Sequence, residues 1–321
     1  MKKIIALLLA AALVFALCAC GSAGTSSSKK TYTVGICQLV QHVALDSATQ
    51  GFIDALTEEL GDAVTFDNQN ASGDIPTCAT ICNGFVSSKV DLILANATPA
   101  LQAAAAATDT IPVLGTSITE YGVALQLKDF NGTVGGNVSG TSDLAPLDQQ
   151  AQMILDLFPD TKNVAILYCS AEANSVYQAD VVEAYLEGKG ISVERFTFAD
   201  SNDVSIVTQS ACDNADALYI PTDNMAASCA DAINNVAEPA GVPIIAGEVN
   251  LCALCGVATL SIDYYNLGVT TGKMAAKILK GEADISKMPI EYFENPVKMY
   301  NPDLAAKFNL DIPDDFVAIE G

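Results

Sequence analysis

From residue 32 onward, short β-type runs alternate with helical runs, and this rhythm restricts the possible folds more than any other feature of the chain. A first round of β-type runs covers 32–39, 64–68, 91–95 and 111–115. The helical run between the first two of them, 44–60, carries its large apolar residues on one face. Such alternation predicts a parallel sheet with helices on both of its faces.

A second round follows a segment, 130–143, that is dense in Gly, Asn, Ser and Thr. The β-type runs of this second round cover 163–168, 192–198, 217–220 and 242–246. We therefore predict an α/β protein with two doubly wound parallel-sheet lobes joined by a hinge; a single larger doubly wound domain is the alternative. The predicted first lobe comprises 31–141 and about 249–286, and the second comprises 142–248 and about 287–321.

The first residues have the pattern of a secretory signal. Two lysines precede an apolar run to Leu17, which is shorter than the roughly 20 residues of a membrane span. The sequence Leu17-Cys18-Ala19-Cys20 resembles the lipobox of bacterial lipoproteins, although an ordinary signal with two incidental cysteines is the alternative. The prediction is a signal peptide over 1–19, a lipidated (palmitate-bearing) Cys20 on the outer face of the bacterial membrane, and a flexible Gly/Ser-rich tether over 20–30.

Net charge and cysteine content exclude several classes of function. The formal net charge of −23 argues against binding to nucleic acid or to anionic lipid. Of ten cysteines, eight follow Cys20, and we interpret them as buried free thiols that pack as small hydrophobes, with a disulfide as the rival interpretation. Cys252 and Cys255 have the spacing of a zinc or redox motif. Because no second such pair and no histidine lies near them, we expect neither a metal nor a cofactor.

Polar residues follow the ends of the predicted strands. Ligands of open α/β sheets bind outside the carboxyl ends of the strands, so two facing lobes would bring these residues around one site. The candidate ligand-binding residues are Gln41, His42, Thr98, Ser142, Asp143, Glu172, Asn174, Ser175, Asp223, Asn224, Asp263 and Tyr264.

Two kinds of contact with a solute are expected. Thr98-Pro99 begins a helix whose first-turn amides suit a carboxylate, whereas Asp223 and Asp263 suit an amine. Thr98 and Asp223 each have a structural alternative. Thr98 could cap its own helix, and Asp223 could cap the helix at Met225. These alternatives stay open at the level of the sequence.

The remaining candidates also have two interpretations. Ser142-Asp143 is either a hinge or a ligand contact, and Asn174 or Ser175 either caps the next helix or reaches the solute. The predicted pattern gives Glu172 no helix to cap. Tyr264 and Tyr265 would point to opposite faces of a strand, so at most one of them should face a ligand.

His42, the only histidine, follows the first strand and either lines the site or caps a helix. A catalytic pair with Cys37 lacks an acidic partner that would orient the imidazole. The chain also lacks the phosphate loop, the nucleophile elbow and the zinc-binding histidine pair. We therefore expect no enzyme.

Several stretches, in a fixed order over 32–313, resemble one family. They are Gly35-Ile-Cys-Gln-Leu-Val-Gln41-His42, Ala97-Thr98-Pro99, Gly135-Gly136-Asn137, Ser142-Asp143, Asn174-Ser175, Pro221-Thr222-Asp223-Asn224 and Ile262-Asp263-Tyr264. The chain is similar to ABC-transporter substrate-binding lipoproteins with the type I periplasmic-binding-protein fold. Better-known members bind tryptophan or other aromatic amino acids.

This resemblance implies a monomeric receptor that closes two lobes over a small solute, an amino acid or more specifically an aromatic one. It implies delivery of the solute to an ABC permease and its ATPase, with contact to the membrane through the lipid anchor alone. Two rivals stay open: a sensor module of the same fold with a signalling partner in the membrane, and a surface enzyme that uses Cys37 and His42.

Overall fold

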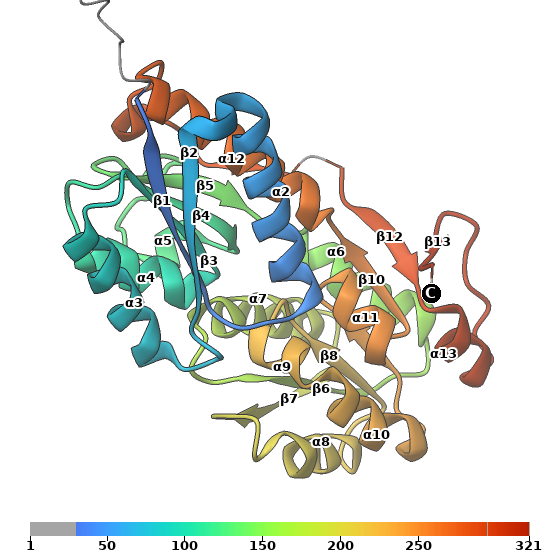
Figure 1. Cartoon of the computed structure of the whole chain (residues 1–321). Helices are drawn as coiled ribbons and strands as arrows, with labels where there is room; N and C mark the ends of the chain where they lie inside the picture. Colours follow the sequence, from blue (N-terminus) through green and yellow to red (C-terminus); the bar gives the residue numbers. More distant parts are fainter. Residues whose placement is uncertain (1–29, 294, 321) are drawn as a thin grey trace, which may run out of the picture. The chain divides into compact units, whose positions relative to one another are not determined.

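Two sheets, each with helices on both faces, organise the chain (Figure 1). The computed structural model describes residues 30–293 and 295–320; the predicted signal peptide, Cys20 and nearly all of the tether lie outside them. In spatial order the first sheet contains β11 (Glu291–Tyr292), β5 (Val138–Ser142), β4 (Val113–Ile118), β3 (Leu92–Asn96), β1 (Tyr32–Gln38) and β2 (Val64–Asn70). The second contains β13 (Val317–Ala318), β12 (Val297–Tyr300), β10 (Ala258–Ser261), β9 (Ile244–Ala246), β8 (Ala217–Ile220), β6 (Asn163–Cys169) and β7 (Ser192–Phe198).

The prediction of two α/β lobes with parallel sheets is confirmed. The first sheet is parallel throughout, and the second is parallel except where β10 pairs with β12. Helices of the first lobe are α2 (Val43–Leu60), α3 (Ile75–Ser88), α4 (Thr98–Ala107), α5 (Tyr121–Ala124) and α12 (Tyr264–Lys280). Those of the second are α6 (Leu147–Leu157), α7 (Ala173–Gly188), α8 (Val204–Cys212), α9 (Asn224–Ser228), α10 (Ala230–Ala240), α11 (Val249–Cys255) and α13 (Pro302–Lys307). Two short 3₁₀ helices, η1 (Gly61–Ala63) and η2 (Ile285–Lys287), complete the elements.

Alternating side chains of the central strands fill a core on each face of the first sheet. On β1, Val34 and Ile36 pack toward Phe52 of α2 and Met274 of α12. Cys37 points to the other face, under α3 and α4. Strands that are buried on both faces have continuous apolar sequences, and this is why they could be predicted from the sequence.

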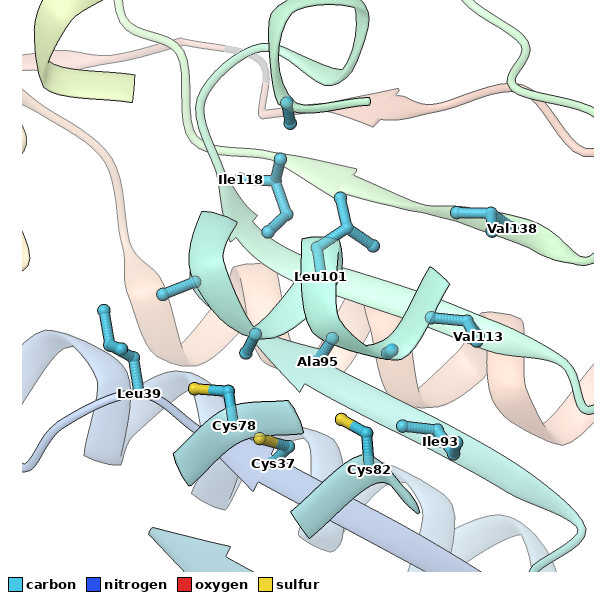
Figure 2. Close-up of a cluster of buried hydrophobic side chains, with 14 of the residues drawn as sticks. Cys37, Leu39, Cys78, Cys82, Ile93, Ala95, Leu101, Val113, Ile118 and Val138 are labelled. Atoms are coloured by element: carbon cyan, nitrogen blue, oxygen red, sulfur yellow. The ribbon is translucent and has the colours of Figure 1, made fainter. Parts of the chain in front are cut away.

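The cysteines of the described chain are free, and all but Cys229 are buried. Figure 2 shows Cys37, Cys78 and Cys82 among Leu39, Ile93 and the other apolar side chains between the first sheet and the helices α3 and α4. The thiols therefore pack as small hydrophobic groups, as the sequence analysis predicted.

Two predictions about local structure were wrong. The segment 130–143 was expected to be irregular, but its end forms β5, a fully buried strand. A Cβ at Gly140, where φ is 146°, would lie 2.1 Å from the Gly115 carbonyl oxygen, so small residues are needed there for packing rather than for flexibility. The sequence pattern over 225–236 also predicts one helix, but the structure divides this segment at Cys229 into α9 and α10.

The chain crosses between the two sheets differently from the predicted boundaries. The segment of about 249–286 was assigned to the first lobe, but α11 and β10 belong with the second sheet, and only α12 packs on the first. Tyr264 and Tyr265 start the helix α12 instead of extending a strand. None of the described helices is both long and apolar enough to cross a membrane.

Candidate functional site

The carboxyl ends of strands from both sheets carry the predicted site residues. Parallel strands end at the same edge of a sheet, so residues after β1, β3 and β4 share one edge and residues after β6, β8 and β9 share another. The two edges are in contact, because the imidazole Nε2 of His42 lies 3.4 Å from the Oδ1 of Asn224. We call them the first-lobe edge and the second-lobe edge.

Glu172 and Asp223 are two buried carboxylates on the second-lobe edge. Glu172 accepts hydrogen bonds from the backbone N–H groups of Asn224 (3.2 Å) and Met225 (2.9 Å). Asp223 accepts them from Cys169 and Ala226, both at 2.7 Å. Burial raises both pKa values, and the charge of Asp223 contributes to a pKa of about 8 for Glu172. Asp223 thus caps α9, as its structural alternative predicted.

Asp143 differs from them because one of its oxygens is unused. Its Oδ2 accepts a hydrogen bond of 3.0 Å from the Tyr264 hydroxyl, whereas its Oδ1 is buried and has no hydrogen-bond partner among the described residues. Burial raises the pKa of Asp143 to about 6. A buried acceptor without a donor costs free energy that a bound donor would recover.

Asn174 supplies a second unused acceptor. Its Nδ2 donates to the Thr222 carbonyl at 2.9 Å, and its Oδ1 is buried without a partner in the described chain. The alternative in which Asn174 or Ser175 caps the next helix does not hold, because both lie inside α7, whose N-cap position is Glu172.

Glu248 belongs to the same group, although it was not among the predicted residues. It caps α11 by accepting hydrogen bonds from Leu251 N–H and from Asn250 N–H, the latter at 2.7 Å. Burial raises its pKa to about 7, with a contribution from the charge of Asp143. The strand-end rule that selected Asp223 applies equally to Glu248, which comes soon after the run 242–246.

We call Asp143, Glu172, Asp223 and Glu248 the acid cluster. Its hydrogen-bond donors are backbone amides, side-chain amides and hydroxyls, all of them neutral. Ion pairs in the described part of the chain lie elsewhere, as between Lys298 and Asp315 on the surface. Burial lowers the pKa of His42 to about 4, so its imidazole is neutral as well. The acid cluster can therefore accept a cation.

The first-lobe edge has the opposite character. The helix α4 begins at the buried Thr98 with no side-chain cap, so Thr98 does not cap its own helix as one alternative had it. Ala97 before it has a φ of 92°, and Ser117 on the adjacent strand has a φ of 55° and a buried hydroxyl without a partner among the described residues. First-turn N–H groups of a helix carry partial positive charge, which favours an anion.

Three predicted residues do not join this arrangement. Gln41 and Asp263 are exposed, and the Asp263 side chain caps α12 through Asn266. Ser142 is buried, but its hydroxyl donates to the Thr119 carbonyl at 2.9 Å and accepts from Leu144 N–H at 3.2 Å. The suggested pair of Cys37 and His42 is not formed either, because Cys37 packs in the core (Figure 2) while His42 contacts Asn224.

Two doubly wound lobes with polar strand ends that face each other are typical of solute-binding receptors. The family model for the ABC transporter substrate binding protein matches residues 33–320. The chain belongs to this family, and it is an extracytoplasmic substrate-binding protein of an ABC transporter.

Comparison with individual proteins gives the same class. The chain is 35% identical over 315 residues to a tyrosine-binding protein of Clostridioides difficile, covering 94% of this chain and 91% of that protein. A Streptococcus pneumonia domain in complex with L-Trp has a TM-score of 0.84 at 33% identity, covering 89% of this chain and 97% of that one. The ligand-free, open structure of a Clostridium difficile substrate-binding protein with adhesive properties has a TM-score of 0.68 at 34% identity, covering 90% and 99%.

Identity to these last two proteins is nearly equal, and the TM-score is higher with the L-Trp complex than with the open, ligand-free structure.

Proposed function

We propose that this receptor binds an aromatic α-amino acid, with tyrosine and tryptophan as the first candidates, between the two lobe edges and delivers it to an ABC permease. The acid cluster carries the proposal: it concentrates buried carboxylates without a cationic partner and leaves an acceptor open on Asp143 and on Asn174. An ammonium group is a donor that matches both needs, because charge-assisted hydrogen bonds are strong in a desolvated site.

The carboxylate of the amino acid would bind on the first-lobe edge. The first turn of α4 is buried and lacks a side-chain cap, and the Ser117 hydroxyl has no partner in the described chain. A carboxylate bound there would accept hydrogen bonds from N–H groups that the helix itself leaves unpaired. The names of the relatives, one tyrosine-binding and one in complex with L-Trp, support an aromatic side chain.

Calorimetric titration of the soluble domain tests this proposal. L-tyrosine and L-tryptophan should bind, whereas tyramine, which lacks the carboxylate, and 3-(4-hydroxyphenyl)propionate, which lacks the amine, should each bind at least about 100-fold more weakly. Equal binding of L-tyrosine and of the analogue without the amine would sink the assignment of the acid cluster.

The position of the receptor in the cell is a further part of the proposal. The sequence Leu17-Cys18-Ala19-Cys20 supports acylation of Cys20, and the 20–30 segment would then tether the lobes near the permease. Replacement Cys20→Ser should release the protein from membranes, and mass spectrometry of the membrane-bound form should find the lipid on Cys20. A Cys20→Ser protein that stays membrane-bound would contradict the anchor.

A further inference from the structure

A pocket of about 560 Å³ lies where the chain crosses between the lobes, and two of its lining residues, Tyr264 and Asn250, donate hydrogen bonds to Asp143 and Glu248 of the acid cluster. The volume is within the range of about 300–1,000 Å³ that is typical of small-molecule sites. None of the solute contacts proposed above needs this pocket.

The walls of this hinge pocket come from both lobes. Ser47 on α2 and Tyr265 on α12 belong to helices that pack on the first sheet. Asn250 on α11 and Val297 on β12 belong to the second sheet and its helices. The pocket therefore has this form only when the lobes hold the arrangement described here, and a bulky side chain on either wall should fill it.

The residues that line the pocket determine which class of small molecule can bind there. Ile262 and Met299 are apolar and Tyr264 and Tyr265 are aromatic, so a flat apolar molecule would bury its faces there. Asp263 is the one charged side chain among the lining residues that the structure describes. A carboxylate without a neighbouring base disfavours an anion and tolerates a neutral or cationic group.

We propose that the hinge pocket is a second small-molecule site, which takes a neutral or cationic aromatic compound. It is distinct from the site between the lobe edges, and the proposal does not depend on which amino acid that site binds. Aromatic side chains supply the contact area, and Asp263 discriminates against anions.

Indole, tryptamine and indole-3-acetate form a matched probe set, because they share one ring and differ in charge. The chain contains no tryptophan, so excitation at wavelengths longer than the tyrosine absorption band reports the fluorescence of the indole ring alone. With L-tyrosine at saturation, indole and tryptamine should still bind, and indole-3-acetate should bind about fivefold more weakly than tryptamine because Asp263 is largely exposed.

Substitutions on opposite walls test the location. Ser47→Phe and Val297→Phe should each weaken indole binding at least about tenfold. The control Ile206→Phe, on the exposed surface of α8, should leave it unchanged, and circular dichroism verifies that each variant folds.

An Asn174→Ala variant distinguishes this proposal from the proposed function, because Asn174 belongs to the acid-cluster site and does not line the pocket. Indole binding that persists in Asn174→Ala and is lost in Val297→Phe supports the hinge pocket, whatever happens to L-tyrosine. Indole binding that is lost in Asn174→Ala, or that is unchanged in both wall variants, overturns it.

Discussion

The helices that begin at the two lobe edges satisfy their first N–H groups in opposite ways. On the second-lobe edge, Asp223 and Glu248 cap the helices α9 and α11 with buried carboxylates. On the first-lobe edge, α4 begins without any side-chain cap, at a residue whose φ of 92° an alanine rarely adopts. Negative charge therefore collects on one side, and unpaired N–H groups on the other. The difference suits a zwitterion, whose two charged ends lie a few bonds apart.

Asp143 connects the two edges. It directly follows β5 of the first sheet, yet its charge contributes to the raised pKa of Glu248 on the second-lobe edge, and it accepts a hydrogen bond from Tyr264. The carboxylates of Glu172 and Asp223 accept hydrogen bonds from N–H groups of the helix α9 and, for Asp223, also from Cys169 at the end of β6, so they stabilise the fold. Asp143 keeps one oxygen open, so it is the member of the acid cluster that ligand binding should affect most.

Removing the charge of Asp143 should produce the largest effect. Asp143→Asn should weaken L-tyrosine binding about 100-fold, since a charge-assisted hydrogen bond of about 2–3 kcal/mol is lost. The unfolding free energy of the ligand-free protein should not fall, because the variant removes a buried unpaired charge. Calorimetry gives the affinity, and urea denaturation gives the stability.

The exposed Asp263 provides the matched control. Asp263→Asn keeps a good helix cap for α12 and should change the affinity less than about threefold. If both variants weaken binding equally, the distinction between an open buried acceptor and a saturated exposed one fails.

The pH dependence should be the next largest effect. Burial raises the pKa of Asp143 to about 6, of Glu248 to about 7 and of Glu172 to about 8, all above the values of about 4 in an unfolded chain. The folded, ligand-free protein therefore binds more protons than the unfolded chain between pH 4 and 8. Its stability should fall as the pH rises through this window.

A bound ammonium group favours the ionised carboxylates, so affinity should change with pH in the opposite direction. Only about a tenth of a group with a pKa of 6 is ionised at pH 5, so L-tyrosine should bind about tenfold more tightly at pH 7 than at pH 5. Calorimetry in buffers of different ionisation enthalpy should show proton release on binding. Proton uptake would contradict the role of the acid cluster.

The sequence predicted the sheet strands well, because strands such as β3 are buried on both faces and read as apolar runs. It missed β5, whose Gly, Ser and Thr residues are selected by close packing against Gly115 and Tyr121 and carry no apolar signal. The strand-end rule selected most of the polar residues that the structure places at the two lobe edges, and it was not applied to Glu248, which also follows a strand.

The state of each carboxylate could not be predicted from the sequence. Asp223 is saturated by the N–H of Cys169, which is 54 positions away, and Asp143 meets Tyr264 across 121 positions. Local spacing describes a helix cap, but it says nothing of partners that the fold brings from another strand. The choice between a cap and a ligand contact therefore needed the structure.

A smaller effect is expected on the first-lobe edge from Ser117→Ala. The Ser117 hydroxyl is buried without a partner in the described chain, so its removal should leave stability within about 0.5 kcal/mol and weaken L-tyrosine binding about fivefold. Ser139→Ala is the matched control, because the Ser139 hydroxyl donates to the Met288 carbonyl at 3.1 Å and its loss should lower stability without changing affinity. The reverse pattern in the two variants would place the ligand carboxylate elsewhere.

The smallest predicted effect concerns the strain at the start of α4. The backbone of Ala97, with φ 92° and ψ 156°, lies in a region that glycine adopts freely and that costs other residues about 1–3 kcal/mol. Ala97→Gly should therefore raise the unfolding free energy by about 1 kcal/mol, after the greater chain entropy of glycine is subtracted. Affinity for L-tyrosine should change less than about twofold, because the N–H groups keep their direction.

Ala95→Gly, on β3 just before Ala97, serves as the control, because Ala95 is equally buried and its φ is not positive. This variant should lower the unfolding free energy by about 1 kcal/mol, since glycine adds chain entropy to the unfolded state there without relief of strain. Urea denaturation of the two variants side by side gives the comparison. If both substitutions destabilise the protein, the first-lobe edge stores no backbone strain, and its contrast with the second-lobe edge reduces to the missing helix cap.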